Sequence, residues 1–424
     1  MIVPACRLTG ILMMNIYRAR WIIPIEGPPI EHGILAVDNG QIVQVASAHE
    51  KPGLTDSAAS SIQDFGESIL LPGFVNAHTH LELTCYRDQL SPGPLWTWLE
   101  QLTALRFRSE AEPLEREAVR IGAAESLAAG VTCVGDISRT GLSVEVLKKS
   151  PIRKVCFLEL ISGASRPPND ASTLATAFEH MAKLAEPERL VIGVSPHAVY
   201  SVVREELSAV ATLAKATRAP LTMHLLETDE EVAWLARGEG VVAEVLNRHS
   251  LPNADVVIDT DVLEWLSQTG VLSGSPLLAH VNYVSDRQLD RLAESRATVV
   301  WCPRAHRFFG HANHRWRAML SRRVNVCVGT DSAASNESLS ILDELRLVRR
   351  NHPDVPPEVI LEMGTLRGAV GLGLDDIVGS LKLGKRADFV KVPVNPNGDK
   401  DPVLNLLDGE KAVDGVWVDG AAVV

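Results

Sequence analysis

Eight short apolar runs rich in β-branched residues recur along the middle of this 424-residue chain and leave little freedom in the choice of fold. Each run is apolar at successive positions rather than at every second one, which is typical of parallel strands covered on both faces. Amphipathic stretches of helical character, such as residues 113–130 and 202–217, lie between most of the runs. Eight strands alternating with helices predict an α/β protein built on a (β/α)8 TIM barrel. The runs span residues 70–77, 131–137, 152–160, 189–196, 220–226, 276–284, 297–304 and 324–331.

The two ends of the chain have a different pattern, in which short strands are joined by tight turns. Residues 9–70 contain hairpin-like runs around Asn39-Gly40, and residues 386–424 contain similar runs around Asp419-Gly420. Such dipeptides accept the positive φ angles that two-residue hairpin turns require. We therefore expect a small β-sandwich assembled from both termini. The predicted domains are 1–68 for its N-terminal part, 69–375 for the barrel and 376–424 for its C-terminal part.

Charge and cysteine content exclude several classes of protein. The net charge is −12, and no run of Lys or Arg is long enough to follow a phosphate backbone, which argues against a nucleic-acid partner. No segment approaches the ~20 apolar residues of a membrane span.

The apolar part of the first 14 residues is too short for a signal peptide, and the cysteines form no CxxC pair, so we expect reduced thiols in a cytoplasmic protein. The cysteines are Cys6, Cys85, Cys133, Cys156, Cys302 and Cys327.

Polar residues of ligand type stand where four of the predicted strands end. His78 and His80 project to the same side of an extended chain, since residues i and i+2 do so. His224 lies near the end of the run at 220–226, His280 ends the PLLAH part of the run at 276–284, and Asp331 ends the run at 324–331. Any one of these residues has an ordinary explanation, such as a packed histidine or a helix cap. The carboxyl ends of barrel strands meet at one rim, however, so agreement among four strands predicts a common site.

Three imidazoles and one carboxylate suit Zn²⁺ or a similar divalent ion with a position left open for water. Such an ion lowers the pKa of bound water from 15.7 towards ~7. Glu227, three residues beyond His224, can move protons without entering the coordination sphere. His280 can be either a ligand or a residue that polarises the water. Lys154 begins its strand and no strand ends in lysine, so we expect one ion rather than a carbamylated-lysine pair.

Four motifs resemble those of the amidohydrolase superfamily, in particular its mononuclear branch of nucleoside, guanine and cytosine deaminases and triazine chlorohydrolases. The tail at 379–390 and 416–420 resembles the returning sandwich strands of that family. The resemblance implies that His78, His80, His224 and Asp331 are the metal ligands, that Glu227 is the acid/base residue and that His280 orients water or substrate. The motifs are GFVNAHTHLE at 73–82, HLLE at 224–227, AH at 279–280 and GTDSAASN at 329–336.

The resemblance also implies some of the substrate contacts. His197, within 194–201, matches a histidine that often touches a purine nitrogen, and Trp96 lies in a segment resembling the family's lid, at 94–102. Glu82 and Glu159 lie at strand ends and are candidates either for binding substrate hydroxyl or amino groups or for holding loop amides.

One segment departs from the family. Where the branch usually shows CP-x-S-N, this chain has CPRAHRFFGHANHRW at 302–316. Arg304 and His306 are candidate substrate-binding residues in such a loop, with Arg304 facing a carboxylate or phosphate. An equal alternative is a packed lid in which Arg304 pairs with a nearby acid.

Together these features predict a cytoplasmic hydrolase with one divalent metal ion, Zn²⁺ or Fe²⁺, that deaminates an aminated heterocycle. The expected partner is a small-molecule heterocyclic substrate, an adenine-type nucleoside resembling S-adenosylhomocysteine or aminodeoxyfutalosine, bound by a homodimer. A triazine chlorohydrolase or aminohydrolase, or a guanine or cytosine deaminase, would use the same residues. A non-catalytic barrel scaffold is the alternative from another class, and the loss of a ligand would be its signature.

Overall fold

The computed structural model describes residues 14–49, 61–163, 170–249, 251–253, 257–258 and 260–424. Most of the N-terminal segment weighed above as a signal peptide, including Cys6, lies outside these residues. All five cysteines of the described chain are free thiols. Among the described helices, none has both the length and the apolar character needed to cross a bilayer.

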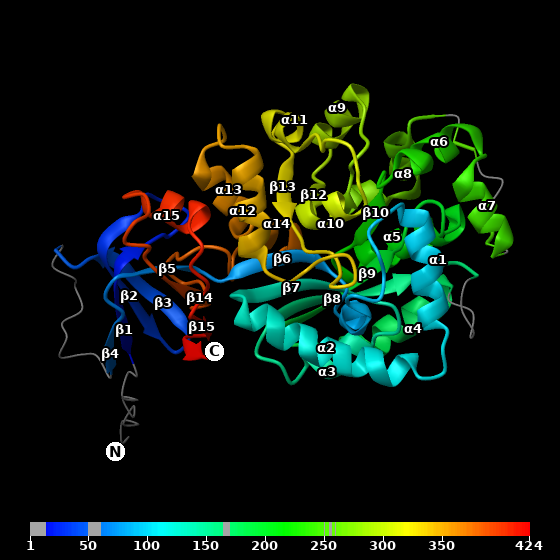
Figure 1. Ribbon diagram of the computed structural model, residues 1–424. Coiled ribbons are helices and arrows are strands. Elements are labelled where there is room, and N and C mark those ends of the chain that lie inside the picture. The colour runs from blue at the N-terminus through cyan, green and yellow to red at the C-terminus, as the bar shows by residue number, and fades with distance from the viewer. Residues whose placement is uncertain (1–13, 50–60, 164–169, 250, 254–256, 259) are drawn as a thin grey trace, which may run out of the picture.

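The central strands close into a barrel, which confirms the predicted fold (Figure 1). They form two four-stranded parallel sheets, β6-β7-β8-β9 and β10-β11-β12-β13. A bridge between Val194 and Leu221 joins the two sheets, and a bridge between Thr79 and Asp331 closes the ring. The strands are β6 (Phe74–Thr79), β7 (Val131–Ser138), β8 (Arg153–Leu160), β9 (Leu190–Pro196), β10 (Thr222–Leu225), β11 (Leu277–His280), β12 (Thr298–Trp301) and β13 (Asn325–Val328).

Helices surround the barrel and account for the continuously apolar strands, since β7 and β8 are buried at every position. The helix α5 shows how they pack: it buries Leu207, Val210, Ala211 and Ala214, which lie on one face. The helices are α1 (Leu95–Arg106), α2 (Ala111–Ala128), α3 (Leu142–Leu147), α4 (Ala171–Ala182), α5 (Arg204–Thr217), α6 (Asp229–Arg237), α7 (Val241–Arg248), α8 (Val262–Thr269), α9 (Asp286–Glu294), α10 (Pro303–Phe308), α11 (Trp316–Ser321), α12 (Ile341–Asn351), α13 (Pro357–Met363), α14 (Leu366–Leu372) and α15 (Pro402–Asp408), with 3-10 turns η2 (Leu81–Tyr86) and η3 (Val271–Gly274).

Strands from both termini build one further sheet beside the barrel (Figure 1), as predicted. Its order is β16-β15-β14-β5-β1-β2-β3, with β4 paired to β1, and a bridge from Gln41 to Arg386 links β3 to the chain just before β14. Phe389 and Trp417 stack in its core with ring centroids 4.7 Å apart. The strands are β1 (Asn15–Ile22), β2 (Ile30–Asp38), β3 (Gln41–Ser47), β4 (Ser61–Asp64), β5 (Ser68–Pro72), β14 (Phe389–Pro393), β15 (Gly415–Val418) and β16 (Ala421–Ala422).

The run predicted as one strand at 70–77 is two strands, and the single-strand prediction is wrong there. The first part, in β5, pairs with β14 of the terminal sheet, and the second part, in β6, pairs with β7 of the barrel. Gly73 separates them, and a Cβ atom at this position would lie 2.0 Å from Oγ1 of Thr132. The chain therefore crosses from sheet to barrel at Gly73, while the predicted domain limits stay a prediction.

Arg153, at the start of β8, joins the barrel to the terminal sheet. Its side chain is fully buried, and its Nε and Nη2 atoms donate to Asp388 at 2.6 and 3.0 Å. It also pairs with Asp419 in the turn between β15 and β16. Lys154 follows it at the same end of the barrel, opposite the strand ends that carry the histidines.

Candidate active site

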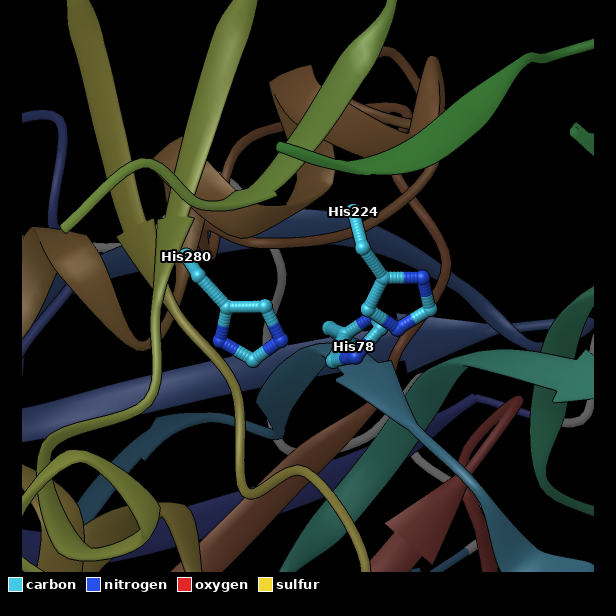
Figure 2. Close-up of side chains that lie close together, drawn as sticks. All are labelled: His78, His224 and His280. Carbon is cyan, nitrogen blue, oxygen red and sulfur yellow. The ribbon is translucent and has the colours of Figure 1, made fainter. Parts of the chain in front are cut away.

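The histidines and the aspartate predicted at four strand ends come together at one rim of the barrel. Ligand atoms of His78, His224 and His280 lie within 4.8 Å of one another, and so do those of His78, His80 and Asp331. Figure 2 shows the rings of His78, His224 and His280 directed into the same space from three segments of the chain. The convergence predicted from the sequence is therefore present in the fold.

The imidazole nitrogens in this cluster are arranged as a cation would require. Among the described residues, neither ring nitrogen of the buried His78 has a hydrogen-bond partner. Nδ1 of His224 lies 3.1 Å from the carbonyl oxygen of His197, to which it donates, so its Nε2 is left to face Nε2 of His80 at 3.4 Å. Burial lowers the pKa of His78 and His80 and lowers that of His224 to about 4, which keeps the rings neutral. Neutral imidazoles oriented through a backbone carbonyl fit a divalent metal ion.

Asp331 supplies the negative charge of the cluster. Its Oδ1 atom lies 3.6 Å from Nε2 of His80 and 3.8 Å from Nε2 of His78. Its Oδ2 atom accepts a hydrogen bond of 2.6 Å from the hydroxyl of Ser335, which leaves Oδ1 directed at the rings. Burial raises the pKa of Asp331 to about 6, so a cation beside it would favour the charged form.

Glu227 and His280 form a second pair next to the cluster. Nε2 of His280 lies 3.5 Å from Oε1 of Glu227, and both side chains are buried. Burial, followed by the nearby carboxylates of Asp331 and Glu231, raises the pKa of Glu227 well above its ordinary value. A carboxyl group in that condition can give and take a proton at neutral pH.

The backbone at this rim is held in an unfavourable conformation. Leu226, His280, Val281 and Asp331 all have positive φ angles, between 50° and 69°, which residues other than glycine seldom adopt. Glu231 stabilises one of these turns, because its buried carboxylate accepts the N–H groups of Leu226 and Glu227 at 3.1 and 2.8 Å. Strain of this kind gathers at functional sites, where the surrounding structure fixes it.

A cavity of about 350 Å³ opens onto the cluster. Of the residues predicted to bind substrate, Trp96, Glu159 and His197 line it, together with His80, His224, Glu227, His280 and Asp331. Trp96 is fixed by a hydrogen bond of 3.3 Å from its Nε1 to Thr228 and by edge contact with Tyr200. Apolar side chains form much of the remaining wall: Leu83, Leu95, Trp98, Leu99, Leu102, Phe107, Ile161, Val245, Leu246, Leu251 and Phe309.

Glu82 does not line this cavity. Its buried carboxylate accepts hydrogen bonds from Arg106 at 2.7 Å and from Ser138 at 2.6 Å. Arg106 is the last residue of α1, so the pair ties the lid helix to the chain that follows His80. This position agrees with the alternative in which Glu82 stabilises neighbouring protein segments and does not bind substrate.

Arg304 and His306 are also placed away from the cavity, and the first part of the predicted substrate loop is the short helix α10. The Arg304 guanidinium donates to Glu344 at 2.9 Å and to the carbonyl oxygen of Ser338 at 2.8 Å. Arg304 is therefore paired with a nearby acid, as in the packed-lid alternative given from the sequence. Its guanidinium does not face the cavity, which contradicts the predicted contact with a ligand there. Of this segment, only Phe309 reaches the cavity wall among the described residues.

Several wall residues were not predicted from the sequence, among them Arg106, Arg139 and Tyr200. Arg139 directly follows β7, so an arginine at a predicted strand end was a usable signal, and Arg106 stands in the last turn of the predicted lid helix. Tyr200 carried no such signal, whereas Phe309 belongs to the segment 302–316 that was predicted as a substrate loop.

Comparisons with known proteins agree with this site. A family model described as "Amidohydrolase family" matches residues 69–423. The 5-methylthioadenosine/S-adenosylhomocysteine deaminase of Saccharophagus degradans is 28% identical, over 96% of this chain and 91% of that protein. The structure of Helicobacter pylori aminofutalosine deaminase superposes with a TM-score of 0.83 at 25% identity, covering 97% of this chain and 100% of that one. An adenosine deaminase of Xanthomonas campestris with bound zinc has the same fold, with a TM-score of 0.83 at 23% identity over 96% and 92% of the two chains. A model match over most of the length, from the start of the barrel to the last strands, means that the chain belongs to the amidohydrolase family.

Proposed function

We propose that this protein is a metal-dependent hydrolase that removes the amino group from the adenine ring of a 5′-substituted nucleoside. The 5-methylthioadenosine and S-adenosylhomocysteine class is favoured by the names of the relatives, and an aminodeoxyfutalosine-like nucleoside by the Helicobacter structure. The observation that carries the proposal is the meeting of four ligand-type side chains with Glu227 and His280 in one cavity. The cytoplasmic location and the homodimer stay predictions from the sequence.

His78, His80, His224 and Asp331 would hold one divalent ion, with His280 beside it. Zinc is favoured over iron because the Xanthomonas relative carries zinc and because three imidazoles with one carboxylate suit that ion. When bound, such an ion activates a water molecule as nucleophile and holds it in place.

The protein's own groups then move the protons of the reaction. Deamination forms a C–O bond at the ring carbon, breaks its C–N bond and releases ammonia. Glu227 is placed to take a proton from water, deliver it to the neighbouring ring nitrogen and later help the amino group to leave. Nε2 of His280, 3.5 Å from Oε1 of Glu227, is placed to keep the attacking oxygen in line.

The cavity walls fit the rest of such a substrate. Trp96 and Phe309 present aromatic surface to a purine or an apolar 5′ group, and Glu159 and His197 offer polar atoms. The Arg139 guanidinium stacks on Phe107 at 5.3 Å and forms no ion pair with any described residue. Burial and the neighbouring Arg106 lower the pKa of Arg139 although the carboxylates of Glu159, Glu115 and Glu82 act in the opposite direction, so an anionic substrate group there would further stabilise the charged guanidinium. Arg139 therefore takes the role that the sequence suggested for Arg304.

The test is ammonia release from a panel of substrates by purified protein of measured metal content. We expect about one zinc ion per chain and turnover of at least one of adenosine, 5-methylthioadenosine, S-adenosylhomocysteine and aminodeoxyfutalosine. Metal-loaded protein that deaminates only guanine, cytosine or a triazine would overturn the proposal, and so would protein that deaminates none.

A comparison of S-adenosylhomocysteine with 5-methylthioadenosine also isolates the role of Arg139, because of these two only S-adenosylhomocysteine carries a carboxylate. Replacing Arg139 by Met is expected to lower kcat/KM for S-adenosylhomocysteine about 10-fold and to leave that for 5-methylthioadenosine nearly unchanged. Equal losses for the two would remove Arg139 from substrate recognition.

A further inference from the structure

The segment that departs from the family pattern, 302–316, lies against the backbone of the two proposed proton-handling residues. His314 reaches the carbonyl group of His280, and His306 reaches Asn282, which in turn holds the carbonyl group of Glu227. None of His306, His314 and Asn282 lines the cavity. Their contacts therefore act on the backbone of the site residues and not on a ligand in the cavity.

The contact at His280 is direct. Nε2–H of His314 donates to the carbonyl oxygen of His280 at 2.8 Å, and the His314 ring stacks on Trp301 with centroids 5.2 Å apart and planes 16° from parallel. His280 and Val281 have φ angles of 69° and 51°, two successive left-handed residues without a glycine. Such a backbone persists only where neighbouring groups over-determine it. The donor on His314 is one of those groups.

The contact at Glu227 passes through one more side chain. Nδ2 of the buried Asn282 donates to the carbonyl oxygen of Glu227 at 2.9 Å. Oδ1 of the same amide lies 3.1 Å from Nδ1 of His306, and Nε2 of His306 lies 2.6 Å from the carbonyl oxygen of Ala312. Both of these oxygens accept hydrogen bonds, so a neutral His306 ring donates to one of them at a time. The two histidines thus fix the ends of one short segment, and each connects that segment to a different residue of the Glu227–His280 pair.

We propose that His306 and His314, with Asn282, are positioning residues that set the distance and orientation between Glu227 and His280. The inference rests on the proposed function, which gives that pair its role. It assigns His306 and His314 to the support of catalysis, in place of the substrate binding that the sequence suggested for His306.

The first experiment separates the hydrogen bond of His314 from its packing. H314F keeps an aromatic ring on Trp301 and removes the donor, whereas H314Q removes the ring and keeps an N–H near the position of Nε2. H352F is the matched control, because His352 packs edge-on against Trp316 in the same aromatic cluster without touching residue 280. We expect H314F to lose ~10–100-fold in kcat with KM and metal content nearly unchanged, and H314Q and H352F to stay within about threefold of the unaltered protein.

The second experiment repeats this comparison for the amides. N282L removes the donor to Glu227, and N325L removes an amide whose Nδ2 donates to Thr298 and to the Arg367 carbonyl group, both at 3.0 Å, at the opposite end of the barrel. A purely structural role predicts that both variants lose thermal stability and keep their kcat when folded. The positioning role predicts a kcat loss of ~10-fold or more in N282L only.

Two results would overturn the inference: turnover by H314F within about twofold of the unaltered protein, or a loss in H314Q as large as that in H314F. If the unaltered protein deaminates nothing in the panel, the proposed function fails by itself. Crystal structures of H314F and H314Q then decide the inference. A His280 that leaves the left-handed region in H314F alone supports positioning, and a His280 that keeps its φ in both contradicts it.

Discussion

The carboxyl group of Glu227 depends on its surroundings for its chemistry. Burial and two neighbouring carboxylates raise its pKa, so that the side chain can hold a proton where an exposed glutamate could not. Glutamine has nearly the same shape and cannot exchange that proton. We expect E227Q to keep the metal content of the unaltered protein while kcat falls by at least ~10².

Steady-state kinetics and metal analysis on the same preparation measure both quantities. E239Q serves as the control, since Glu239 is exposed on the loop before α7. An E227Q variant with ordinary turnover would show that another group moves the protons.

Individual site residues were predictable where a polar side chain ended an apolar run. His78, His224, His280 and Asp331 each break such a run, and the barrel then fixes where they meet. Arg304 was not predictable in the same way, because its residue type suits an anionic ligand and a buried ion pair equally well. Only the direction of α10 shows that its guanidinium turns towards Glu344.

At the scale of elements, β6 and β13 approach each other more closely than side chains ordinarily permit. A Cβ atom at Gly329, just after β13, would lie 2.7 Å from the carbonyl oxygen of His78 and 3.0 Å from its Cβ. Because both contacts are with the backbone or its first side-chain atom, G329A must push the two strands apart. We expect G329A to lose bound metal and activity together, with a melting temperature lower by several degrees, about the effect of 1–3 kcal/mol.

Metal content, turnover and thermal unfolding measured on one sample check this prediction. G274A is the matched control, since a Cβ atom at Gly274 would meet nothing within 4 Å. Metal retained at full occupancy in G329A would mean that the strands tolerate the displacement.

The strands themselves were largely predictable, and the limits of that prediction have a physical cause. Apolar continuity marks a segment buried on both faces, and all eight such runs contain a strand of the barrel. It does not say which sheet the segment joins, so the break at Gly73 between two sheets was missed. The helix α10 was missed because Gly310 and several histidines surround only six helical residues, too few to show a period.

For the whole molecule, Arg153 is the main charged connection described between barrel and terminal sheet. Removing it leaves Asp388 buried without its cationic partner. We expect R153M to lower the free energy of unfolding by about 3–5 kcal/mol, because an unpaired buried charge costs that much. Denaturant unfolding followed by tryptophan fluorescence and circular dichroism measures it.

The control is R116M, whose ion pair with Glu145 is about half exposed and should contribute about 0–1 kcal/mol. The active site lies at the other end of the barrel, so folded R153M should keep its kcat. Equal unfolding midpoints for R153M and R116M would show that the buried pair does not hold the two parts together.

The ring of strands is closed by Thr79 and Asp331, which stand 252 positions apart in the chain. Two of the proposed ligands thus emerge early from the ribosome and the fourth emerges only after the last barrel strand. A chain that ends before residue 331 therefore lacks both the aspartate ligand and the bridge that closes the ring of strands. Translation products that stop before residue 331 would for this reason be inert.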